Sequence, residues 1–281
     1  MFPDEDQSPT YRSIVALVGP DTRSPATLRL AVKAAHRLGS SLTALFVSPK
    51  LPARTVREVG EALKSRFLDD IENASISGHW HELEVVPGDD GLDLEEMRAA
   101  TRMADFVFVS PETAQSLLST NRAAEIPYHL ARECGRPVVF LPPSDADENS
   151  GAAGNFAARV TIAWDGGREA TRAVRDALPL LSLANDVIVL SVDSDRNGEA
   201  TISGGRDIAK YLTAHGIPVR LHQTYVAHGD VGGTILSRAS EAGSNLVVMG
   251  ACAHPHTLDL SLGGATRHVL DNMTVPVLMS C

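Results

Sequence analysis

Cysteine, aromatic residues and long apolar runs are all scarce in this sequence. Only three cysteines occur among its 281 residues. Because they are widely spaced and odd in number, we expect reduced thiols rather than a disulfide framework. No apolar run approaches the roughly 20 residues of a membrane span, and the acidic N-terminus lacks the basic and apolar regions of a signal peptide. These absences predict a soluble, cytoplasmic protein.

A basic surface and recognisable catalytic motifs are also missing. The formal net charge is −10 and no stretch supplies a basic stripe, which argues against nucleic acid and anionic membranes as partners. The sequence contains no Gly-x-Ser-x-Gly elbow, no Walker A loop and no paired carboxylates with a matching base. We therefore expect no enzyme of an ordinary type, with slow ATP hydrolysis as the most that it catalyses.

Short apolar runs alternate with helical patterns in the first half of the chain. Such runs are typical of strands that are covered on both faces of a parallel sheet. Between the first two runs, Ser24 and Pro25 predict the N-cap and first residue of a helix that stops at Gly39. The predicted strands are Ile14–Val18, Ser41–Val47, Glu82–Val86, Phe106–Val109 and Val138–Leu141. Five strands alternating with helices predict a doubly wound parallel α/β sheet.

The same order of elements then starts again. A polar segment of small residues, Asp145–Gly154, has the composition of a linker. After it, Val160–Trp164 repeats the first strand, Val187–Val192 the second and Asn245–Met249 the fourth, and the second copy has a shorter middle. The repeat predicts a tandem duplication. We expect one five-stranded α/β domain at 11–143, a linker at 144–157 and a second domain at 158–281.

The stretch Asn245–Ser280 has the layout of a phosphate-binding loop. An apolar run stops at Gly250, a polar and His-rich loop follows, and Gly263 and Gly264 precede a helical pattern that begins at Ala265. Small residues at a helix start let backbone N–H groups approach an anion. The stretch therefore predicts an anion site at the start of the last helix.

This stretch resembles the C-terminal signature of the universal stress protein family, G-x-x-G-x9-G-S/T, which wraps the phosphates and ribose of ATP in that family. The corresponding positions here are Gly250, Ala253, Gly263 and Gly264, so two of the four match. Ala253 introduces a Cβ that costs on the order of 1–2 kcal/mol if a left-handed backbone is needed. Gly264 lacks a hydroxyl whose hydrogen bond is worth about 1 kcal/mol, and Thr266 is close enough to replace it.

The resemblance covers both halves and implies a tandem universal stress protein. In that family the two α/β domains pack as a pseudo-dimer, and their fifth strands pair antiparallel. Here those strands would be Val138–Leu141 and Val277–Met279. A stress-response protein that acts by binding is the implied function, and the pseudo-dimer also leaves room for a homodimer of whole chains.

The resemblance further implies that a nucleotide site, where present, lies in the second half. Asp165 takes the place of the family's Asp after strand one, and Val192 that of the segment that contacts adenine. The first half has Gly19 opposite Asp165 and Ser110 opposite Gly250, and Ala123-Ala124 stand opposite the glycine pair, so its site is expected to be degenerate. The expected ligand is ATP or a related adenine nucleotide, with Mg²⁺ only if ATP is bound. The expected site residues are Asp165, Val192, Gly229, Asp230, Gly250, Ala253, Gly263, Gly264, Ala265 and Thr266.

Two alternatives remain open. In the first, the glycines are only turns, and the protein is a scaffold or regulator that binds a protein partner without nucleotide. In the second, Cys252, His254 and His256 hold a metal ion, since thiolate and imidazole are zinc ligands. Their spacing is not that of a usual metal site, and a polar loop over the cleft explains them better. We therefore expect no metal.

Overall fold

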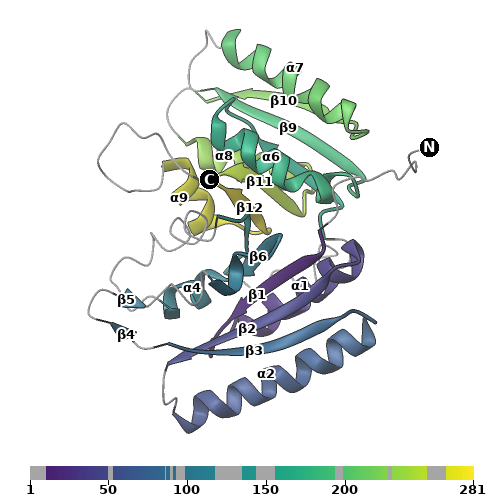
Figure 1. Cartoon of the computed structure of the whole chain (residues 1–281). Coiled ribbons are helices and arrows are strands. Elements are labelled where there is room, and N and C mark those ends of the chain that lie inside the picture. Colours follow the sequence, from purple (N-terminus) through teal and green to yellow (C-terminus); the bar gives the residue numbers. More distant parts are fainter. Residues whose placement is uncertain are drawn as a thin grey trace, which may run out of the picture.

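The computed structural model describes residues 11–49, 53–85, 87–88, 91–92, 99–117, 135–143, 156–193, 199–226, 230–251 and 264–281. Ten strands form one sheet with helices on both faces (Figure 1). The strands of the first half are β1 Ser13–Val18, β2 Ser41–Pro49, β3 Gly78–Val85, β6 Phe106–Val109 and β7 Val138–Phe140. Those of the second half are β8 Arg159–Ala163, β9 Asp186–Asp193, β10 Arg220–Tyr225, β11 Leu246–Gly250 and β12 Val277–Ser280. A separate short hairpin joins β4 Pro87–Gly88 to β5 Gly91–Leu92.

The two halves have the same strand order. The sheet runs β10-β9-β8-β11-β12-β7-β6-β1-β2-β3, so each half reads third, second, first, fourth and fifth strand from its outer edge to the centre. All pairs of this sheet within a half are parallel, and β12 pairs with β7 antiparallel, with Leu278 opposite Val139. The tandem α/β fold and the pairing of the fifth strands are therefore confirmed. The two five-stranded sheets are joined edge to edge because this pair continues the hydrogen-bonded ladder.

Helices cover the sheet in two sets that follow the alternation of side chains along the strands. Even-numbered residues of β1 such as Ile14 and Ala16 belong to the core under one set of helices, and odd-numbered ones such as Val15 and Leu17 to the core under the other. The first set comprises α1 Ser24–Leu38, α2 Arg54–Asn73, α6 Arg168–Leu181 and α7 Glu199–Ala214. The second comprises α4 Pro111–Leu117, α8 Val231–Glu241 and α9 Gly264–Asn272. As the repeat predicts, α7 is shorter than its counterpart α2.

The start of β3 and the cap of α1 differ from the predictions. Strand β3 begins at Gly78, four residues before the predicted Glu82, because Trp80 packs against Phe46 and Phe67 with ring centroids 5.6 and 5.9 Å apart. Ser24 lies inside α1 instead of capping it. The Asp21 carboxylate takes that role, since its Oδ1 accepts the backbone N–H of Ser24 at 2.9 Å.

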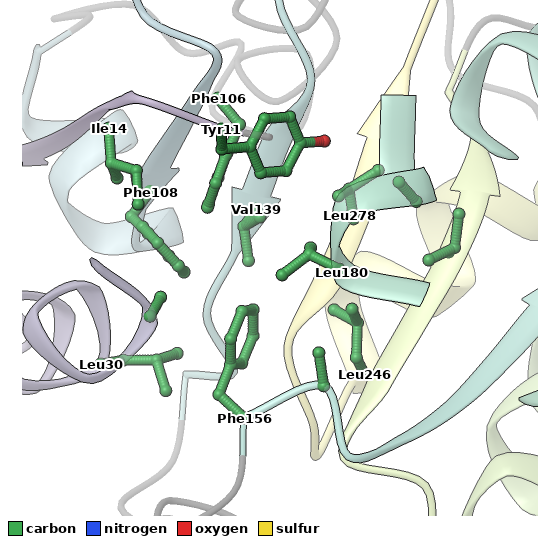
Figure 2. Packing of buried hydrophobic residues seen from close by; sticks show 14 of the residues in the cluster. Tyr11, Ile14, Leu30, Phe106, Phe108, Val139, Phe156, Leu180, Leu246 and Leu278 are labelled. Carbon is green, nitrogen blue, oxygen red and sulfur yellow. The ribbon is translucent and has the colours of Figure 1, made fainter. Parts of the chain in front are cut away.

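The side chain of Phe156 packs between the first half and the second. It lies at the end of the predicted linker, the rest of which, apart from Ala157, is outside the described residues, and its side chain is only 2% exposed. Figure 2 shows it between Leu30 and Phe108 of the first half and Leu180 of the second, and its ring centroid is 5.6 Å from that of Phe108. This residue therefore belongs to the core that both halves share.

Arg37, near the end of α1, adds polar contacts to the same junction. Its Nη1 donates to the Phe156 carbonyl at 2.6 Å, and its Nη2 donates to the Leu183 carbonyl in the second half. Partial burial lowers the pKa of this guanidinium below its ordinary value. The two halves are thus joined by backbone pairing, by apolar packing and by hydrogen bonds from one arginine.

No helix in the described part of the chain is long and apolar enough to cross a membrane.

Truncating Phe156 should separate the contribution of the shared core from that of the surface. We expect Phe156→Ala to lower the free energy of unfolding by about 3–5 kcal/mol, as for other buried aromatic residues. The control is Met103→Ala, at a side chain that is 81% exposed, which should change it by less than about 0.5 kcal/mol. Urea unfolding of both variants makes the comparison, and equal small effects would contradict a role for Phe156 in the core.

Tyr11 provides a test of the buried junction at high pH. Its hydroxyl is buried and has no hydrogen-bond partner among the described residues. Burial, and then the charges of Asp176 and Asp105, raise the pKa of this phenol above its ordinary value. Because the folded-state pKa is the higher one, the stability that depends on neutral Tyr11 is complete below the unfolded-state pKa of about 10 and declines as the pH rises above it.

We therefore expect Tyr11→Phe to flatten the loss of stability between about pH 9 and 11. Near neutral pH it should be neutral or stabilise the fold by up to about 1 kcal/mol, because no hydrogen bond from the hydroxyl is lost. Tyr211→Phe, at an exposed position, is the matched control. If Tyr11→Phe and the wild type lose stability equally over this pH range, the phenol is not the group responsible.

Candidate functional site

The carboxyl edge of the second half brings several predicted site residues together. In open α/β sheets, ligands bind beyond the carboxyl ends of the strands where the strand order reverses. That point lies between β8 and β11, which pair with Ile162 opposite Val248. Asp165 follows β8 and Gly250 ends β11, so both lie at this edge. Val192 lies near the end of the neighbouring β9 and is half-buried.

Asp165 is exposed at the turn into α6. Its Oδ1 accepts the backbone N–H of Gly167 at 2.8 Å, and this is its one hydrogen bond among the described residues. Gly166 between them has a φ of +78°, a left-handed conformation that favours glycine. The turn therefore holds the carboxylate at the edge of the sheet with acceptor capacity left for a ligand.

Gly250 is needed for packing within the protein. A Cβ at this position would lie 2.8 Å from the backbone nitrogen of Ala170 and 2.8 Å from Cβ of Glu169. The first turn of α6 therefore approaches the end of β11 so closely that only glycine fits there. The sequence pattern identifies the glycine, but its neighbour Glu169 is visible only in the tertiary structure.

Asp230 is already engaged within the protein. It caps α8, because its Oδ1 accepts the backbone N–H of Gly233 at 2.8 Å, and the same oxygen is 3.3 Å from Nδ1 of His268 on α9. At Gly232 a Cβ would lie 2.7 Å from Cβ of His268. These contacts hold α8 against α9. An Asp directly before a helical pattern, as in Asp230-Val231, is the sequence signal that could have indicated such a cap.

The start of α9 remains open among the described residues. The helix begins at Gly264, which is exposed and has no atom within 4 Å of the place where a Cβ would stand. Its first turn carries no acidic residue, Ala265 is half-buried and Thr266 is buried. A helix start has backbone N–H groups without partners in the helix and a partial positive charge. This part of the site can therefore accept an anion.

The remaining predicted site residues, Gly229, Ala253 and Gly263, lie outside the described residues, as do Cys252, His254 and His256 of the alternative metal site. Within the described ranges, no group of three His, Cys, Asp or Glu side chains is placed to hold a metal ion. Cys281 is disulfide-bonded, so the expectation that all three thiols are reduced is wrong. Spacing along the sequence did not show which cysteines the fold brings together.

The matching edge of the first half is filled by hydrogen bonds between protein groups. Ser110 stands at the end of β6 and is fully buried, and its Oγ accepts the backbone N–H of Thr113 at 3.0 Å. Thr113 Oγ1 donates to Asp21 Oδ2 at 2.7 Å, and Ser24 Oγ donates to the same oxygen at 3.0 Å. Ser24 Oγ in turn accepts the backbone N–H of Gly19 at 2.9 Å. The start of α4 is thus capped from within.

Substitution of two glycines in the second half distinguishes a glycine that close packing requires from one that faces open space. We expect Gly250→Ala to destabilise the protein by about 1–3 kcal/mol, because its Cβ would collide with backbone and side-chain atoms of α6. The control is Gly264→Ala, which meets open space and has no left-handed φ. It should be neutral or stabilise by up to about 1 kcal/mol. Thermal unfolding of the two variants tests this, and a tolerated Gly250→Ala would contradict the close approach of α6.

Known proteins resemble the chain in sequence over one half and in structure over both. Residues 157–280 match the Universal stress protein family, whereas no curated protein matches the chain in sequence. A universal stress protein from Archaeoglobus fulgidus DSM 4304 is 16% identical, with a TM-score of 0.67 over 98% of each chain. A functionally unknown protein from Pseudomonas aeruginosa PAO1 is also 16% identical, with a TM-score of 0.62 over 96% of this chain and 92% of its own.

A shorter structure, a universal stress protein in complex with cAMP, is 17% identical and covers 46% of this chain and 94% of its own, with a TM-score of 0.32. The full-length likenesses concern the fold, and the family assignment comes from the sequence of the second half. Residues 157–280 are therefore similar in sequence to the universal stress protein family, and over its whole length the chain has the fold of the Archaeoglobus fulgidus universal stress protein, as a tandem of two α/β halves.

Proposed function

We propose that this protein acts by binding an adenine nucleotide at the carboxyl edge of its second half, without ordinary enzymatic turnover. The observation that carries the proposal is the contrast between equivalent edges of the two halves. In the first half Ser110, Thr113 and Asp21 satisfy one another. In the second half Asp165 is exposed, and α9 starts at an exposed glycine. One edge is closed by its own side chains, and the other offers an acceptor and an anion site.

Each group has a role that suits its chemistry. The Asp165 carboxylate would accept a ribose hydroxyl, and Val192 would lie beside the base. The first residues of α9, Gly264, Ala265 and Thr266, would direct N–H groups toward the phosphates, with Mg²⁺ balancing their charge when ATP is the ligand. Asp230 would support the site indirectly, since its carboxylate already holds α8 and α9 together.

Ligand-induced thermal shifts of matched variants test the proposal. ATP with Mg²⁺ at about 100 times its dissociation constant should add about 2.7 kcal/mol of stability to the wild type. Asp165→Asn should weaken binding about tenfold, because a hydrogen bond to a charged acceptor is lost, while stability without ligand changes little at this exposed position. Asp21→Asn in the first half is the matched control. It should lower stability, since Asp21 accepts several buried hydrogen bonds, and leave the affinity for nucleotide unchanged.

Absence of any shift at millimolar ATP with Mg²⁺ would reject nucleotide binding, and equal loss of affinity in both variants would reject the placement at Asp165. The second candidate function, a scaffold or regulator that binds a protein partner, would then replace the first. It is favoured by one observation: packing alone accounts for Gly250, because α6 occupies the space of its missing Cβ. Mass spectrometry of small molecules released from gently purified protein separates the two candidates. A cytoplasmic location remains a prediction from the sequence.

A further inference from the structure

The two outer strands of the sheet differ in how they are protected. Among the described residues, β3 pairs only with β2, and β10 pairs only with β9. An outer strand presents N–H and C=O groups to any further strand, and proteins commonly place charges there to prevent such pairing. Strand β3 follows this rule, since it exposes His79, His81, Glu82 and Glu84.

Strand β10 lacks this protection. Its sequence, RLHQTY, contains no acidic residue and no proline. Its one arginine, Arg220, is the first residue of the strand and forms an ion pair with Asp186 of the neighbouring strand. The remaining positions present neutral or apolar side chains and His222. Nothing in the strand itself repels a second strand of the same sequence.

One face of β10 also exposes large apolar side chains. Leu221 is 50% and Tyr225 is 41% exposed, and alternation along the strand puts both on the same face as Gln223. Leu221 lies beside Val189 of β9, whose side chain belongs to the core under α6 and α7. Helix α7 packs against β10 (Figure 1) and contributes Tyr211, which is 37% exposed. Leu221 and Tyr225 are therefore exposed on the face of β10 that continues the core face of Val189.

We propose that two copies of this chain associate through β10, which pairs antiparallel with β10 of the second copy across a two-fold axis. Such an axis is perpendicular to the sheet and keeps each face on its own side. Only residues an even number of positions apart can then lie opposite one another, so the axis passes midway between one residue and the same residue of the second copy. Centred on Gln223, the pairing places Leu221 opposite Tyr225 of the second copy, and the symmetry repeats this pair.

Within the six residues of β10, this register is the one that places both Leu221 and Tyr225 opposite an apolar side chain of the second copy. A pairing centred on His222 would instead place Leu221 opposite Gln223, and Arg220 opposite Thr224. Apolar and aromatic cross-strand pairs stabilise a sheet more than mixed pairs do, so the register at Gln223 is preferred. It also places no two like charges opposite each other. The partner is therefore a second copy of this chain, in a closed and self-complementary contact.

The protein already contains one junction of this kind. Strands β7 and β12, from the two copies of the repeat, pair antiparallel at the centre of the sheet and place Val139 opposite Leu278. The pairing at β10 would apply the same geometry to the outer edge. It does not depend on the proposed nucleotide site, which lies at the carboxyl edge between β8 and β11.

Charged substitutions of the residue at the two-fold axis test the proposed dimer most directly. In the proposed register, Gln223 faces Gln223 of the second copy. Light scattering of the full chain during size-exclusion chromatography should show a mass that falls from dimer to monomer on dilution. Gln223→Lys and Gln223→Glu each place like charges opposite each other and should raise the dissociation constant of the dimer about fivefold or more. An equimolar mixture of the two variants should restore the dimer, because lysine then faces glutamate.

His81→Lys, at an exposed position on the opposite edge strand, is the matched control and should leave the dimer intact. A wild type that stays monomeric at every concentration would overturn the proposal. Variants that dimerise as well as the wild type would place the contact elsewhere. With both variants folded by circular dichroism, failure of the mixture to recover would reject this register. Hydrogen exchange of the wild type gives an independent check, since protection of the β10 amides must increase with concentration.

Discussion

The antiparallel pair of β7 and β12 joins the two copies of the repeat, and the rest of the structure depends on it. Its backbone bonds merge two parallel sheets into one, so neither fifth strand is left as an open edge. Apolar side chains then fill both faces of the junction, among them Phe156, which reaches it from the segment that connects the halves. Because the core crosses this boundary, the stability of each half depends on the other.

The equivalence of the two halves makes their differences informative. Both have the same strand order, and both direct the ends of their first and fourth strands to the same kind of edge. In the first half a serine at the end of the fourth strand caps the next helix and joins a network that includes Asp21. In the second half a glycine at that place lets α6 approach closely and contributes no polar group. The residue at the end of the fourth strand is thus part of a hydrogen-bond network in the first half and a close-packed glycine in the second.

The two halves also differ in charge at the outer edges of the sheet. The copy of strand three in the first half exposes histidines and glutamates, whereas the copy in the second half exposes leucine and tyrosine. A parallel strand in the middle of a sheet is protected on both sides by its neighbours, but an outer strand has only its own side chains for protection. The two outer strands thus differ in their exposed side chains while the strand order of the two halves is the same.

The sequence by itself determined the class of fold, the duplication and the strands with continuous apolar runs. Phe106–Val109 has the predicted bounds, because a strand buried on both faces needs an apolar residue at every position. The resemblance to the universal stress protein family implied which strands meet at the centre. Only the tertiary structure decided the start of β3, which depends on Trp80 packing against Phe46 and Phe67, and the disulfide at Cys281. The reason for Gly250 likewise lies in the approach of Glu169 and Ala170 in the first turn of α6, far earlier in the chain. Local patterns record burial and turns along one segment, whereas these features depend on which distant segments the fold brings into contact.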